Sequence, residues 1–178
     1  MTDFVLSAGN TIRPHRSPWG AFPVKGAAIS TGISSNQINI GTVVQLDGST
    51  NNQIFPVALS SRSLNPSAIV GVAAEATQGG GTTTNARGTV ISVWEANPNV
   101  EFKAWTRFGL LDSTLLGQPK ELTRDSTLNI DLVNLSASSL ATPAKCVIIT
   151  SLIDAAGDSG GAVTFRFNTS SGFLAYYK

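Results

Sequence analysis

Residues 89–108 read TVISVWEANPNVEFKAWTRF, and this stretch decides the fold class of the chain. Its second half alternates apolar with charged side chains, which is the period of two of a half-buried β-strand. The apolar positions are Val100, Phe102 and Ala104, and the charged ones are Glu101 and Lys103. Because strand-like runs flank the turn at residues 97–99 on both sides, the pattern predicts a β-hairpin.

Short strand-like runs recur on both sides of this stretch and are separated by polar turns. We expect strands at residues 42–46, 53–59, 68–74, 89–94, 100–108, 126–135, 145–153, 162–168 and 172–177. In the run at 126–135, the pattern places Leu128, Ile130 and Leu132 on a buried face and Asn129 and Asp131 on a polar face. No segment keeps a helical period over twelve residues, and only residues 112–116 predict a short helical turn. The chain is therefore predicted to be mainly β, an antiparallel β-sandwich or barrel.

The first 26 residues differ from the rest of the chain. Pro14, Pro18 and Pro23 are incompatible with a helix and with a central strand. The segment is nevertheless too apolar for a disordered tail. We predict an extended N-terminal arm at residues 1–26, followed by a single β-rich domain at residues 27–178. Two alternatives stay open: the arm folds back on its own domain, or it lies on a neighbouring subunit or partner. Its candidate anchors are Phe4, Leu6, Trp19 and Phe22.

The composition offers few groups for chemistry. Of 178 residues only 13% are charged, the net charge is +1, and there is one histidine (His15) and one cysteine (Cys146). Hydrolytic, transfer and metal sites need clustered titratable groups, so we expect no catalytic residue, no cofactor and no metal. The weak net charge predicts no direct binding of nucleic acid. Cys146 stands in an apolar run, which predicts a buried side chain.

The sequence shows neither a signal peptide nor a membrane span. Residues 1–26 show no signal-peptide arrangement, and nowhere do 18 apolar residues run together, so no membrane span is expected. The sequence predicts a protein made and used in a cytoplasm, or in a particle assembled there.

Residues 157–161 read GDSGG and match the nucleophile segment of chymotrypsin-like serine proteases. In those enzymes the segment supplies the serine and an oxyanion hole, but the mechanism also needs a histidine base inside a folded barrel. Here His15 precedes the first convincing strand, and no orienting aspartate is marked. Asp, Ser and Gly are also the residues of tight turns. We therefore interpret the segment as a turn, with a serine protease as a remote alternative.

Two tryptophans flank the same predicted turn. The alternation changes phase at Trp105, which indicates either a bulge or a side chain facing outward. Trp94 and Trp105 are typical of a core or of a subunit interface. A glycan-stacking role, in a phage tail or receptor-binding β module, is the alternative for these two residues.

Several motifs between residues 40 and 170 resemble the head decoration (cement) proteins of tailed bacteriophages, particularly those of cyanophages. They are IVGVAAEA from Ile69, a Gly/Thr/Asn loop, and VISVWEANPNVEFKA ending at Ala104. The runs at residues 41–47 and 55–58 are similar too, as are Leu152-Ile153-Asp154, residues 157–161 and the Phe-rich run after them. Residues 1–39 lie outside the resemblance.

The resemblance implies a structural virion protein on the outer surface of an icosahedral phage head, assembled in the host cytoplasm. Such proteins are commonly homotrimers, and they stabilise contacts between major capsid proteins through many modest contacts. The expected partners are therefore the major capsid protein and further copies of this chain. We expect Trp94 and Trp105 at the subunit interface and the arm at the capsid. The expected capsid-binding residues are Phe4, Leu6, Arg13, His15, Arg16, Trp19 and Phe22.

Overall fold

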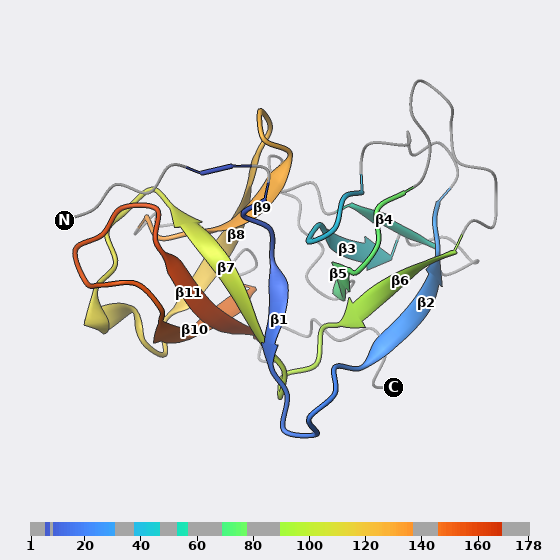
Figure 1. Cartoon of the computed structure of the whole chain (residues 1–178), viewed down its shortest axis with the longest axis horizontal. Helices are drawn as coiled ribbons and strands as arrows, with labels where there is room; N and C mark the ends of the chain where they lie inside the picture. Colours follow the sequence, from blue (N-terminus) through green and yellow to red (C-terminus); the bar gives the residue numbers. More distant parts are fainter. Residues whose placement is uncertain are drawn as a thin grey trace.

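The computed structural model describes residues 6–7, 9–30, 38–46, 53–56, 69–77, 90–136 and 146–168. These residues form eleven β-strands, the 3-10 turn η2 and no α-helix, which confirms the predicted mainly-β class (Figure 1). The strands are β1 (Arg13–Arg16), β2 (Val24–Ala28), β3 (Val43–Leu46), β4 (Ile54–Pro56), β5 (Ile69–Ala73), β6 (Val90–Glu95), β7 (Glu101–Arg107), β8 (Pro119–Asp125), β9 (Ile130–Asn134), β10 (Val147–Leu152) and β11 (Ala162–Phe167).

Five of these strands close into a barrel, in the order β7-β11-β10-β8-β9. The barrel closes because β9 returns to the end of β7 in a short parallel pairing, whereas its other ladders are antiparallel. Inward-facing side chains of β7 and β11 fill the interior. The rings of Phe102, Phe165 and Phe167 lie 5.4–5.8 Å apart, within the range of favourable aromatic pairs. β1 adds to the first half of β7, outside the closed set.

The other five strands form a second antiparallel sheet, in the order β2-β6-β5-β3-β4. Its two edge strands approach each other, because Ile29 bridges to Ile54 and the Ser30 backbone N–H donates to the Ile54 carbonyl (2.9 Å). At Gly71 the strands are so close that a Cβ atom would lie 1.9 Å from the Trp94 carbonyl oxygen. The ladder between β5 and β6 therefore requires glycine at this position.

The barrel and the second sheet share one buried cluster. Ile69, Val72 and Val43 of the second sheet pack in the same apolar cluster as Phe102 and Phe165 of the barrel. Figure 1 shows the two parts side by side, with β1 between β7 of the barrel and the second sheet.

The predicted hairpin between residues 89–94 and 100–108 is wrong. β6 pairs with β2 and β5, whereas β7 pairs with β1, β9 and β11, so the turn carries the chain from one sheet to the other. The Val100 N–H donates to the Asn97 carbonyl (3.0 Å), and Ala96 and Val100 are both buried. Because both flanks of the turn enter the shared cluster, the two strands point into different sheets rather than pairing with each other.

The predicted polar face of the strand at 126–135 is also wrong. β9 is buried on both faces from Ile130 to Val133, and Asp131 is only 1% exposed. The reason is tertiary: β9 lies between the barrel interior and the second sheet, where the Val43 N–H donates to the Asp131 carboxylate.

Three strands were not expected, namely β1, β2 and β8. β1 and the start of β2 fall within residues 1–26, and Pro14 is accommodated because β1 pairs with the outside of β7. The short turn expected at 112–116 is confirmed as η2 (Ser113–Leu115), capped by the Asp112 carboxylate. The strand expected at 172–177, the Gly/Thr/Asn loop and Phe4 lie outside the described residues.

Candidate functional site

The expected capsid-binding residues of the arm lie along the outside of the barrel and beyond it. Arg13, His15 and Arg16 occupy β1 and are exposed to solvent. Trp19 follows in the next turn and is 59% exposed. Two other expected capsid-binding residues are less exposed: Leu6 is half-buried, and Phe22 packs against the shared apolar cluster.

β1 is held in place by its neighbour in sequence and by β7. Ile12, directly before β1, is fully buried in the shared cluster. The register then sets Arg13 opposite Lys103 and Arg16 opposite Glu101. The ladder shifts between Pro14 and Arg16, so His15 lies at an irregularity of the edge. Residues 13–16 of the arm therefore lie along the chain's own barrel, whereas residues 24–26 belong to the second sheet.

The two tryptophans occupy different sheets. Trp94 lies on β6, opposite Val24 and Val72, and packs as a half-buried residue against the shared cluster. Trp105 lies on β7, half-buried, with the Lys103 ammonium 5.3 Å from its ring centroid. Burial keeps alternating along β7 through Thr106, which is buried. Only the hydrophobicity pattern changes phase at Trp105, because an apolar tryptophan faces outward and a polar threonine faces inward.

The segment from Gly157 to Gly161 is confirmed as part of the turn between β10 and β11. The Leu111 N–H donates to the Asp158 carbonyl (2.9 Å), and the Gly157 N–H donates to the Leu111 carbonyl (2.7 Å). Ser159 forms an isolated bridge with Leu110, beyond the end of β7, whereas β1 with His15 pairs with the start of β7. The fold therefore does not bring the histidine and this serine together.

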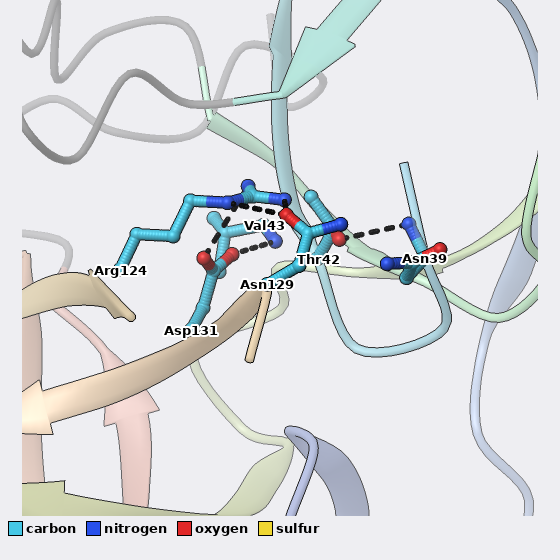
Figure 2. A network of polar contacts seen from close by, with 6 residues as sticks. All are labelled: Asn39, Thr42, Val43, Arg124, Asn129 and Asp131. Atoms are coloured by element: carbon cyan, nitrogen blue, oxygen red, sulfur yellow. Dashed lines mark hydrogen bonds and ion pairs between the residues drawn. The ribbon is translucent and has the colours of Figure 1, made fainter. Parts of the chain in front are cut away.

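A buried polar network joins the barrel to the second sheet (Figure 2). Asp131 Oδ2 accepts a hydrogen bond from the Val43 N–H (2.7 Å), and Asp131 Oδ1 lies 3.5 Å from Arg124 Nη1. Arg124 also donates through Nε to Asn129 Oδ1 (3.1 Å). Asn129 holds a left-handed backbone (φ 53°), which asparagine tolerates better than most residues. The alternation pattern missed this network because it treated Asp131 as solvated.

Burial sets the titration of two groups in the barrel. Desolvation raises the pKa of Asp131 to about 6, and the nearby Arg124 and the Val43 N–H oppose that rise. Desolvation also raises the pKa of the Cys146 thiol to about 12. The predicted burial of Cys146 is confirmed, and the thiol stays protonated and unreactive at neutral pH.

Metal sites and membrane-spanning helices are absent from the part of the chain that the structure describes. Within residues 6–168 as described, no group of three or more His, Cys, Asp or Glu side chains is placed to hold a metal ion. In the same parts of the chain, no helix is long and apolar enough to cross a membrane. Scans against protein-family models and against curated proteins give no match for this chain.

The fold assembles one surface that the sequence did not bring together. The outward positions of β7 include Glu101 and Lys103, and those of β11 include Arg166, which is exposed. Pairing places Lys103 opposite Arg13 and Glu101 opposite Arg16 of β1, while Arg166 follows Phe165, the last residue of β11 that pairs with β7. We call this surface the cationic stripe: Arg13, His15, Arg16, Glu101, Lys103 and Arg166. The alternation in residues 100–108 correctly predicts that Lys103 faces outward, but nothing local predicts its neighbours.

Proposed function

We propose that the chain is a structural virion protein that decorates an icosahedral phage head and stabilises contacts between major capsid proteins. The proposal starts from the resemblance of residues 40–170 to head decoration proteins. The observation that carries it is the exposed edge formed by β1 and the turn after it, in which Trp19, three residues after Arg16, is 59% exposed. A large aromatic side chain held out beside arginine is the composition of a protein-binding hot spot.

The arm acts in this proposal as a presented surface. Ile12 and Phe22 anchor its ends in the shared cluster, so Trp19 and the side chains of β1 are held in a fixed geometry before binding. Preorganisation reduces the entropy lost on association. Repetition over many equivalent positions on a shell then makes weak individual contacts effectively permanent. The homotrimer and the interface role of Trp94 and Trp105 belong to the same proposal.

The test is co-sedimentation with undecorated heads assembled from the major capsid protein of the same source. Wild-type protein is expected to sediment with the heads to saturation, and Trp19→Ala to bind at least tenfold more weakly, because truncating a hot-spot aromatic costs about 2 kcal/mol or more. Leu116→Ala is the matched control, because Leu116 is similarly exposed (46%) but follows η2, outside β1 and the turn that carries Trp19. Failure of wild-type protein to sediment would refute the proposal, and clear hits on a glycan array would favour a receptor-binding module.

A further inference from the structure

The cationic stripe is a concentration of unneutralised positive charge in a chain whose net charge is only +1. Arg13, Arg16 and Arg166 are exposed and Lys103 is half-buried, whereas Glu101 is the single carboxylate among them. None of these four cations lies within 4 Å of a carboxylate in the described residues. By contrast, Arg107 and Arg124 elsewhere in the barrel each have an acidic partner.

One cross-strand pair within the stripe is unfavourable for the isolated fold. Arg13 and Lys103 stand directly opposite each other on neighbouring antiparallel strands. Like charges in such a cross-strand pair destabilise a sheet. Arg13 Nε donates to Thr11 Oγ1 (3.3 Å), and Lys103 lies over the Trp105 ring, so both side chains are held at the surface without a counter-charge. A bound anion would remove the repulsion, which points to an acidic ligand for this face.

The charges also indicate which anion fits. Glu101 lies opposite Arg16, in the middle of the stripe, so a continuous phosphate backbone crossing these strands would meet a negative charge. Nucleic acid binding is also favoured by a strongly positive protein, and this chain is nearly neutral. A protein segment carries carboxylates at discrete positions and can leave Glu101 beside a neutral or basic residue.

We propose that the cationic stripe on the outer face of β1, β7 and β11 binds an acidic segment of a partner protein. The identification of that partner as a capsid protein rests on the proposed function, whereas the acidic character of the segment follows from the stripe itself. Electrostatic pairing of this kind sets orientation and association rate, and it weakens as salt is added.

The decisive variant is Arg13→Glu, because the proposal predicts that it keeps or raises the stability of the fold while it weakens binding to the acidic partner. The substitution turns the Arg13–Lys103 repulsion into an attraction, so the melting temperature should hold or rise, while binding to the acidic partner should fall at least tenfold. Lys120→Glu on β8 is the matched control, since it makes the same charge change on a barrel strand that pairs with none of β1, β7 and β11 and should leave binding unchanged.

Binding is measured on the full chain with three probes: undecorated heads, a deca-glutamate peptide and a 20-base-pair DNA duplex. We expect wild-type protein to bind the heads and the peptide, and to bind both more weakly in 0.5 M than in 0.05 M NaCl. The Arg13→Glu variant should lose binding to the heads and to the peptide. Tighter binding to the duplex than to the peptide would overturn the proposal. Head binding that is insensitive to Arg13→Glu and to salt would overturn it too, while leaving the proposed function intact. Peptide binding without head binding would refute the proposed function and leave the stripe standing.

Discussion

At the scale of single residues, Asp131 places a carboxylate inside the folded protein. Its carboxylate is fully buried, yet it accepts the Val43 N–H and faces Arg124, so it links the barrel to the second sheet. Losing either partner of a buried charged hydrogen bond leaves the other unpaired, which costs more than the bond itself contributes. The network is therefore sensitive both to substitution and to pH.

The raised pKa of Asp131 predicts that its contribution to the free energy of unfolding decreases as the pH rises. Its pKa is about 6 in the folded protein against 3.8 as the ordinary value, so the folded state retains a proton that the unfolded chain has released. The resulting stabilisation is present near pH 4 and is lost as the pH rises through about 6, with an upper limit of about 3 kcal/mol. Urea unfolding at pH 4.5 and 7.5 measures it.

Asp131→Asn should remove this pH dependence, because the amide does not titrate and its oxygen can still accept the Val43 N–H. The variant is expected to be more destabilised relative to wild type at pH 4.5 than at pH 7.5. Asp112→Asn is the control, since the Thr114 N–H lowers the pKa of Asp112 and it stays charged throughout this range. An equal effect of Asp131→Asn at both pH values would contradict the prediction.

Gly71 is a second position where one residue decides the local structure. Alanine there would place a Cβ atom 1.9 Å from the Trp94 carbonyl oxygen, a backbone atom that cannot shift as cheaply as the end of a flexible side chain. We expect Gly71→Ala to destabilise the protein by about 3 kcal/mol or more, as overpacking of a sheet does. Gly117→Ala is the comparison: its φ of +75° costs about 1 kcal/mol, but the added Cβ meets nothing within 4 Å. Equal melting temperatures for the two variants would show that the clash relaxes.

At the scale of elements, β1 shows how an arm is fixed to a barrel. The strand itself is exposed, with one half-buried residue, so its own side chains bury little apolar surface. Its position depends on Ile12 before it and Phe22 after it, both of which pack on the shared cluster. A deletion of residues 1–22 would remove both anchors, so it would open the core as well as remove the arm.

Point substitutions separate the anchoring of the arm from its contacts. Ile12→Ala should cost about 2–5 kcal/mol, the range for truncating a fully buried aliphatic side chain. Trp19→Ala removes a larger but exposed side chain and should change the free energy of unfolding by less than about 0.5 kcal/mol. Thermal and urea unfolding of the two variants checks both values. A large loss for Trp19→Ala would mean that this residue supports the fold rather than a contact.

At the scale of the whole molecule, the barrel and the second sheet depend on each other. The cluster that contains the barrel phenylalanines also contains residues of β3 and β5, and the Asp131–Val43 hydrogen bond crosses the same boundary. Neither part can lose its partner without exposing apolar surface, so unfolding should be one cooperative transition. A rigid unit of this kind suits a protein that acts by presenting fixed surfaces.

The oligomeric state is the prediction that belongs to this scale. If the proposed decoration protein assembles as a trimer, its mass in solution should be about 55 kDa, three times the 18.5 kDa of one chain. Light scattering on the purified protein, with the Trp105→Ala variant alongside, measures the mass directly. A mass of 18.5 kDa for the wild type would contradict a trimer in solution and limit assembly to the shell surface.

The sequence by itself determined the position of most strands, including the fully buried β5 and the half-buried β7. The alternation of residues 100–108 recurs in β7 as strictly alternating burial, and the Gly157–Gly161 segment is the turn that its composition predicts. Cys146 is buried as its apolar surroundings indicated. These features are local, because period, turn chemistry and hydrophobicity act within a few residues.

The tertiary structure alone decided which strands pair and which polar groups are buried. β8 (Pro119–Asp125) has few buried side chains and no clear alternation, yet it is a barrel strand because β9 and β10 supply hydrogen bonds on its two edges. β6 and β7 are adjacent in sequence but belong to different sheets, and Asp131 is buried because the second sheet covers it. The cationic stripe likewise forms only when β1, β7 and β11 meet. Backbone groups pair with whichever strand the packing brings near, and that choice depends on residues far away in the chain.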